Sequence, residues 1–259
     1  MNYDRAGVPV MNNAQSLIIH HWNASPVISS MLILSLDTST TVCSVALHNE
    51  GTLLGCYELF TERTSSAMLT TLLDDVVRQA GYALNQIDAI AVAKGPGSYT
   101  GLRIGVSTAK GLCFALDKPL LAINTLAAMT EQVRAYFPEN SLLCPMLDAR
   151  RMEVYCALYS TDGREVLPTS AQIIGETSFS DWLSRGSIVF FGDGAEKCRT
   201  LLGGQPNAIF PNMTVLPSAR TIGQLSTTAF SAGQFEEVAT FEPFYLKDFM
   251  TTQPRKTVI

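Results

Sequence analysis

Two stretches of sequence decide the fold: LDTSTTVCSVALH at residues 36–48 and LDARRMEVYCALY at residues 147–159. Each begins with Leu-Asp and continues, after a short polar turn, into an apolar run that is typical of a β-strand. The second stretch starts 111 residues after the first (147 minus 36), and each is followed by another polar turn and a third extended run. The sequence therefore predicts an internal duplication in which strand, Asp-bearing turn, strand, turn and strand occur twice.

Helices and strands alternate after the first stretch. Helical spacing of apolar residues predicts helices near residues 65–80 and 98–115, and strands are expected at Ala89–Ala93 and Leu120–Ile123. This order favours an α/β protein in which helices cover the faces of a mixed sheet. Two such units resemble the duplicated actin-like, sugar-kinase-like (ribonuclease H-like) fold, although two short meanders can also resemble each other by chance.

The duplication predicts two lobes. We expect an N-terminal actin-like lobe at residues 31–135 and a C-terminal one at residues 136–259, with the boundary near a turn at Phe137–Asn140. A helix near Ser218–Gln234 is expected to return and close the structure. Residues 1–30 are polar and end before a clean strand pattern, so we interpret them as a leader or a misassigned start outside the fold.

The composition limits the classes of function. The 259 residues are 47% hydrophobic and 16% charged, with a net charge of −5, so disorder and binding of nucleic acid through the overall field are both disfavoured. Any role with RNA would be indirect or would use a local patch. The six cysteines form no CxxC pair, which favours free thiols in the cytoplasm. No apolar run reaches the roughly 20 residues that span a bilayer.

The loop GPGSYTGLRIG at residues 95–105 follows a predicted strand and opens a predicted helix. Its glycine spacing fits neither the dinucleotide nor the Walker signature, so close packing is favoured over anion binding. Ser98 or Thr100 is expected to cap the helix, and Gly101, Gly105 and Ala109 form a smooth edge along it. Arg103 opposes the helix dipole, so we expect it to have an acidic partner inside or outside the chain.

This loop is very similar to the signature of the bacterial TsaB (YeaZ) family. The resemblance covers most of residues 31–250 and includes four further motifs: Asp37–Thr40, Cys43–Leu47, Asp148–Tyr155 and Pro243–Lys247. It implies a non-catalytic subunit of the machinery for tRNA threonylcarbamoyladenosine synthesis. Such a subunit binds and supports TsaD, a catalytic paralogue of the same fold, together with TsaE, a small ATPase. It further implies a weak homodimer when alone. With the charge and the apolar run lengths given above, we expect only indirect contact with tRNA and no membrane partner.

The resemblance to TsaD fails at the residues that do chemistry. TsaD carries a metal site on an Asn-His-Leu-x-x-His stretch, and the matching stretch here, Asn124–Met129, has Thr125 and Met129 at the two histidine positions. The chain has only three histidines, His20, His21 and His48. We therefore expect no metal site, no catalytic residue and no Ser-His-Asp or Cys-His catalysis, which also argues against a metalloprotease.

The nucleotide site that this fold implies is expected to be vestigial. Its residues would be Asp37, Thr38, Ser39, Asp148, Gly192 and Gly194. The turns after Asp37 and Asp148 lack the glycines that let backbone amides approach phosphate, so we expect no cofactor in isolation, and ATP or ADP only within a complex. The alternative function is an ATP-dependent small-molecule kinase or ATPase of the actin-like superfamily, which would need intact phosphate turns.

The predicted helix near residues 65–80 has an apolar arc that is wider than packing on one core requires. We expect the surplus to pack with the glycine-edged helix and to form a partner surface, which the resemblance implies is shared by the homodimer and TsaD. The predicted interface residues are Met68, Leu69, Leu72, Leu73, Val76, Gly101, Arg103, Gly105 and Ala109. The alternative is a wide stripe that is wholly buried inside one lobe.

Overall fold

The structure is a computed structural model that describes residues 31–60 and 66–247. The predicted leader at residues 1–30 lies outside the described residues. Two five-stranded sheets form the framework of the described chain. None of the helices in these two ranges is both long and apolar enough to cross a membrane.

The first sheet has the strand order β3-β2-β1-β4-β5. β1 pairs antiparallel with β2, and β2 with β3, whereas β1–β4 and β4–β5 are parallel. The predicted strands are confirmed, with these bounds: β1 Leu32–Asp37, β2 Val42–Asn49, β3 Thr52–Phe60, β4 Ala89–Gly95 and β5 Leu120–Asn124. Every residue of β1 is buried, as expected for a central strand with helices on both faces.

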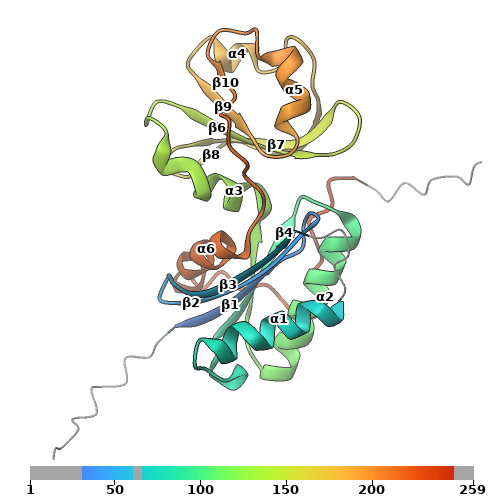
Figure 1. The fold of residues 1–259 in the computed structure, drawn as a ribbon, viewed down its shortest axis with the longest axis vertical. Coiled ribbons are helices and arrows are strands. Elements are labelled where there is room, and N and C mark those ends of the chain that lie inside the picture. The colour runs from blue at the N-terminus through green and yellow to red at the C-terminus, as the bar shows by residue number, and fades with distance from the viewer. Residues whose placement is uncertain (1–30, 61–65, 248–259) are drawn as a thin grey trace, which may run out of the picture. The chain divides into compact units, whose positions relative to one another are not determined.

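Helices cover both faces of this sheet. Figure 1 shows α1 (Ser66–Gln79) and α2 (Tyr99–Leu116) on one face and α6 (Ala219–Ser231) on the other. A short 3-10 helix, η1 (Leu84–Gln86), precedes β4. The side chains between α1 and the sheet form an apolar core that includes Leu69. The predicted helices near 65–80 and 98–115 are therefore confirmed.

The second sheet repeats the order of the first as β8-β7-β6-β9-β10. β6–β7 and β7–β8 are antiparallel, and β6–β9 and β9–β10 are parallel, so the predicted duplication and the actin-like fold class are confirmed. Helices α3 and α5 contact the central strand β6. The elements are α3 Thr125–Val133, η2 Arg134–Tyr136, β6 Leu142–Asp148, β7 Glu153–Ser160, β8 Glu165–Ile173, α4 Ser180–Leu183, β9 Ile188–Phe191, α5 Ala195–Leu202 and β10 Ala208–Ile209.

The predicted returning helix is α6, and it packs on the first sheet although it follows the second in sequence. Gly223 permits the approach, because a Cβ atom there would lie 2.2 Å from Nδ1 of the buried His48. Ser44 Oγ accepts a hydrogen bond of 2.8 Å from the amide of Ala219 at the start of α6. Elements thus cross between the two halves of the sequence: α6 packs on the first sheet, and α3 packs on the second. The predicted boundary between residues 135 and 136 stays a prediction.

Candidate functional site

The turn after β1 is packed into the first lobe. Asp37 is 1% exposed, and its Oδ1 accepts a hydrogen bond of 2.8 Å from the amide of Ser39. Thr38 Oγ1 donates to the carbonyl of Gly101 at 2.7 Å, and the amide of Ser98 donates to the carbonyl of Ser39 at 2.6 Å. The turn is therefore bonded directly to the N-terminal end of α2.

The glycine edge of α2 lies against this turn. A Cβ atom at Gly101 would lie 2.0 Å from Thr38 O, and one at Gly105 would lie 2.4 Å from Thr38 Oγ1. The predicted close approach of another backbone is confirmed, but that backbone belongs to the turn after β1 and not to α1. Ser98 caps the helix, as predicted, by accepting from the amide of Gly101 at 3.4 Å.

Burial raises the proton affinity of the Asp37 carboxyl. It raises the pKa of the Asp37 carboxyl to about 6, and hydrogen bonding from Ser39 offsets this only in part. Oδ2 of Asp37 and Oγ of Ser39 are buried without a hydrogen-bond partner among the described residues. The carboxyl is thus poorly stabilised as an anion, the form in which a carboxyl would hold a metal–nucleotide.

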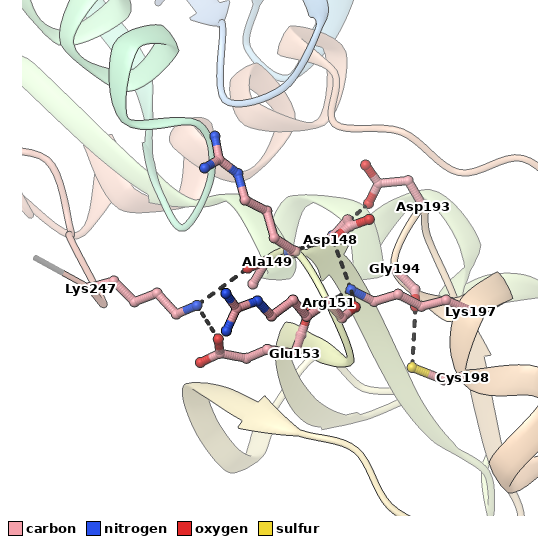
Figure 2. Close-up of polar contacts among 10 residues, drawn as sticks. Asp148, Ala149, Arg151, Glu153, Asp193, Gly194, Lys197, Cys198 and Lys247 are labelled. Atoms are coloured by element: carbon pink, nitrogen blue, oxygen red, sulfur yellow. Dashed lines mark hydrogen bonds and ion pairs between the residues drawn. The ribbon is translucent and has the colours of Figure 1, made fainter. Parts of the chain in front are cut away.

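The turn after β6 lies open, and Figure 2 shows its contacts. Asp148 is exposed, and its Oδ1 accepts hydrogen bonds from Lys197 Nζ at 2.8 Å and from the amide of Arg150 at 2.6 Å. Its own amide donates to Asp193 Oδ1 at 3.0 Å. Partial burial works to raise the pKa of Asp148, but the Lys197 ammonium and the Arg150 amide hold it below its usual value.

The two glycines predicted for the nucleotide site serve close packing. A Cβ atom at Gly192 would lie 2.3 Å from the carbonyl oxygen of Met146, and one at Gly194 would lie 2.8 Å from the carbonyl carbon of Leu147. These glycines therefore let the start of α5 approach β6. The structure brings Gly192 and Gly194 beside Asp148, and Thr38 and Ser39 beside Asp37, each group within its own lobe.

The stretch that matches the metal-binding motif of TsaD forms the start of α3. Asn124 caps the helix by accepting from the amides of Leu126 at 2.8 Å and Ala127 at 3.3 Å. Thr125 and Met129 are both 0% exposed, so they face the packed interior. Among the described residues no group of three or more His, Cys, Asp or Glu side chains is spaced to hold a metal ion.

The actin-like fold implies a nucleotide and a metal ion at turns of this kind. The residues present do not fit them: the Asp37 carboxyl is buried, the Asp148 carboxylate is paired with Lys197, and the Ser39 and Arg150 amides donate to those carboxyls. These turns therefore form contacts within the chain where nucleotide-binding turns would present free donors.

Five of the nine predicted interface residues do not lie on a surface. Leu69, Leu73, Val76, Gly105 and Ala109 are buried inside the first lobe. This corrects their assignment, because the three α1 residues and Ala109 pack in the apolar core with the first sheet and Gly105 lies against Thr38. Four predicted residues remain at least partly accessible: Met68, Leu72, Gly101 and Arg103.

Arg103 is exposed on α2, and its contact within the described residues is an aromatic one. Its Nη1 donates to the hydroxyl of Tyr99 at 2.9 Å, and its guanidinium lies 5.3 Å from the centroid of that ring. Tyr99 in turn packs on Tyr245, with ring centroids 4.8 Å apart. Among the described residues Arg103 thus has a cation–π contact, and an acidic partner outside the chain stays a prediction.

The sequence interpretation missed the most exposed apolar residue of this face. Phe114 on α2 is 88% exposed, and a Cβ atom at Gly111 would meet no atom within 4 Å. Arg103, Ser107, Gly111 and Phe114 are all exposed and recur with helical spacing. We call these four residues the outer face of α2. Their period is visible in the sequence, as is that of the glycine edge on the same helix.

Lys197 and Asp193 were also missed. Lys197 lies 49 residues after Asp148, whose carboxylate it binds, so no local sequence pattern predicts this pair. Asp193 offered one signal, since it stands directly between Gly192 and Gly194 in a turn. An acidic residue in such a turn is a common acceptor for backbone amides.

The duplicated sheets, with an aspartate at the end of each first strand, define an actin-like protein whose nucleotide turns are packed or paired within the chain. The family profile described as TsaD, tRNA N6-adenosine threonylcarbamoyltransferase, matches residues 58–181. The tRNA threonylcarbamoyladenosine biosynthesis protein TsaB of Escherichia coli K12 is 30% identical over 222 residues, which cover 84% of this chain and 95% of that protein. This chain belongs to the TsaB family.

Two further comparisons agree. The structure of YeaZ from Pseudomonas aeruginosa superimposes with a TM-score of 0.70 at 31% identity, and the match covers 83% of this chain and all of that chain. The tRNA N6-adenosine threonylcarbamoyltransferase of Ralstonia pickettii is 30% identical over 190 residues, which cover 67% of this chain and 50% of that enzyme. The likeness to TsaB and YeaZ therefore extends over whole proteins, whereas the likeness to the transferase covers half of the enzyme.

Proposed function

We propose that this chain is a non-catalytic subunit in tRNA threonylcarbamoyladenosine biosynthesis that binds and supports a TsaD-like catalytic paralogue. One observation carries the proposal: Thr125 and Met129, at the positions of the TsaD metal ligands, are fully buried, and Met129 belongs to an apolar core. The packed turn at Asp37 and the paired carboxylate of Asp148 support it. A protein of this family without these sites contributes through binding and not through chemistry.

The outer face of α2 is our candidate for the paralogue surface. It combines an exposed aromatic side chain, Phe114, with the small residues Ser107 and Gly111 and the guanidinium of Arg103. Aromatic and arginine side chains dominate the energetic centres of protein interfaces, and small residues permit close approach of a partner helix. Leu72 on α1 is half-buried and packs on the core, so it joins this surface only through its exposed part.

The test is Phe114→Glu in the full chain, mixed with the TsaD-like paralogue of the same organism and measured by sedimentation velocity. We expect the complex to weaken by about 30-fold or more, which is the effect of losing an energetic centre of about 2 kcal/mol. Because Phe114 is 88% exposed, the fold should survive. Circular dichroism checks this, and self-association should fall in parallel if both partners use one surface.

The matched control is Tyr136→Glu, which makes the same charge change at an aromatic residue that is 76% exposed and lies outside α1 and α2. It should leave the complex unchanged. A folded Phe114→Glu variant that binds the paralogue as the wild type does would overturn the choice of surface. A wild-type chain that never binds the paralogue, with or without nucleotide, would overturn the proposed function.

The remaining assignments follow from the proposal. A TsaE-like small ATPase is the expected third component, and ATP or ADP would bind only within the complex. The six cysteines are free, which supports a reducing compartment such as the cytoplasm. The alternative, an ATP-dependent kinase or ATPase, predicts turnover by the isolated chain of about 1 per second, a low value for an enzyme. It would also require that Asp37→Ala abolish this turnover.

A further inference from the structure

The turn that joins β6 to β7 contains two consecutive arginines with left-handed backbones. The φ angles are 73° at Arg150 and 52° at Arg151. This conformation disfavours side chains that carry a Cβ atom by about 1–2 kcal/mol per residue, and glycine or asparagine normally occupies it. Two consecutive arginines therefore destabilise this turn. Backbone strain of this kind is concentrated at functional sites of proteins.

We call residues 149–152 the arginine turn. Its backbone is fixed by hydrogen bonds within the β6–β7 connection and by hydrogen bonds from a lysine on another element. The amide of Ala149 donates to the carbonyl of Glu153 at 3.0 Å, and the amide of Glu153 donates to the carbonyl of Arg150 at 3.2 Å. Lys197, on α5, donates to the carbonyls of Arg151 at 2.8 Å and Glu153 at 2.7 Å (Figure 2). These bonds fix the turn at the positions where its side chains leave the backbone.

A second lysine holds the same turn from the C-terminal segment. Lys247 Nζ donates to the carbonyl of Ala149 at 3.3 Å and pairs with the carboxylate of Glu153 (Figure 2). Lys197 is paired in the same way with Asp148 at 2.8 Å. Each lysine charge is therefore balanced by a carboxylate. The remaining charged groups at this turn are the two arginines and Asp193, whose Oδ1 accepts from the amide of Asp148, so the turn keeps an excess of positive charge.

The two guanidinium groups are available to a ligand. Arg150 and Arg151 are exposed, and within residues 31–60 and 66–247 neither side chain makes a hydrogen bond or an ion pair. No contact of these two side chains within the described residues therefore explains why arginine stands at either position. A guanidinium presents a planar fork of donors that matches the oxygens of a phosphate, and a rigid backbone lowers the entropy lost when two forks bind together.

We propose that the arginine turn binds the phosphodiester backbone of RNA, and the RNA is the tRNA of the proposed function on which this inference rests. A small nucleotide normally needs a concave site, whereas Arg150 and Arg151 are exposed on a turn. An exposed turn suits a strand that passes over it. Because the chain has a net charge of −5, binding depends on this local pair and not on the overall field.

The experiment is a fluorescence-anisotropy titration of a labelled, unmodified tRNA transcript with the full chain alone, at about 50 and about 200 mM salt. The variant is Arg150→Gly with Arg151→Gly. We expect its affinity to fall about 10-fold or more and the salt slope to decrease by about 1–2, because two phosphate contacts are lost. Its melting temperature should stay equal or rise, because glycine relieves the left-handed strain.

The matched control is Arg164→Gly with Arg185→Gly, which removes the same charge from two exposed arginines of the same lobe. An equal loss of affinity in both double variants overturns the proposal in favour of a general field effect. No binding by the wild type at about 100 µM protein, the weak end of non-specific affinity, also overturns it. Displacement of the transcript by polyglutamate of equal charge as readily as by unlabelled RNA would assign the turn to an acidic protein. None of these outcomes involves the paralogue, so the proposed function is tested separately.

Discussion

The turns at Asp37 and Asp148 occupy equivalent places in the two sheets, yet their carboxyl groups lie in opposite environments. Asp37 is 1% exposed and has a pKa raised to about 6 by burial. The side chain of Asp148 is 49% exposed, and Lys197 and the amide of Arg150 lower its pKa. The two halves thus share the backbone plan of strand, aspartate and turn, while the packing around each turn shifts the pKa of its carboxyl in opposite directions.

The difference follows from what lies across from each turn. Opposite Asp37 is the glycine edge of α2, which lets backbone meet backbone and excludes solvent. Opposite Asp148 is the first part of α5, where Lys197 reaches the carboxylate from the helix surface. The first turn is therefore a packing element, and the second is a polar surface element whose charged side chains are exposed.

The largest expected effect tests the packing of the first turn. Gly101→Ala should destabilise the fold by about 3 kcal/mol, because its Cβ atom would lie 2.0 Å from the carbonyl oxygen of Thr38 and the backbone must shift. Gly194→Ala beside the second turn should cost less, since the shortest distance there is 2.8 Å. Urea denaturation at pH 7 measures both changes in the free energy of unfolding.

Gly111→Ala is the control on the same helix as Gly101. Its Cβ atom would meet no atom within 4 Å, so the higher helix propensity of alanine should stabilise the chain by about 0.5–1 kcal/mol. If Gly194→Ala proved as destabilising as Gly101→Ala, the two turns would be equally packed, and the contrast between them would rest on charge alone.

The next effect concerns the buried carboxyl. The folded-state pKa of Asp37, about 6, lies above its ordinary value of 3.8. The folded chain therefore binds the proton more tightly, and this contribution to stability is complete below about pH 4 and is lost as the pH rises through 6. The loss is on the order of 2–3 kcal/mol, from a shift of about two pKa units.

Asp37→Asn should remove this pH dependence. The free energy of unfolding of the wild type, measured between pH 4 and pH 8, should fall relative to that of the variant as the pH rises. An amide oxygen can still accept from the amide of Ser39, so the variant changes the charge with little change in shape. Parallel curves for the two proteins would show that Asp37 is ionised at no cost and that burial does not distinguish the two turns.

Much of this fold could be predicted from the sequence because its signals are local. The Leu-Asp turn, the strands on either side and the helical periods of α1 and α2 repeat within a few residues, and the structure has them at the expected places. The duplication followed from the same local pattern found twice. The capping by Ser98 was also predicted, since a cap is set by its own helix.

The site was less predictable because its contacts join distant segments. A glycine edge indicates that something packs closely, but not whether the neighbour is a helix or the turn at Thr38, which is 63 residues away from Gly101 in sequence. Leu69 and Leu73 are buried because the first sheet and its other helices cover a wide part of α1. The sequence of α1 alone does not show how much of its apolar arc these neighbours cover. The pairs Lys197–Asp148 and Lys247–Glu153 depend on chain crossings that appear only in three dimensions.

The smallest expected effect tests the second turn through its exposed carboxylate. Asp148→Asn keeps an oxygen that can accept from the amide of Arg150, so the variant mainly removes the charge that pairs with Lys197. Exposed ion pairs contribute about 0–1 kcal/mol, and we expect a loss below about 1 kcal/mol at pH 7.

The pKa of Asp148 is lowered in the folded chain, so its contribution to stability is present above the unfolded pKa of about 3.8 and is lost as the pH falls through the folded pKa. The difference between variant and wild type should therefore shrink as the pH falls below about 3.8, and also at about 1 M salt, where charges are screened beyond roughly 3 Å. Urea denaturation across these conditions measures it. If the free energy of unfolding fell by several kcal/mol, independently of pH and salt, Asp148 would be as much a packing element as Asp37. The contrast between the two turns would then be wrong.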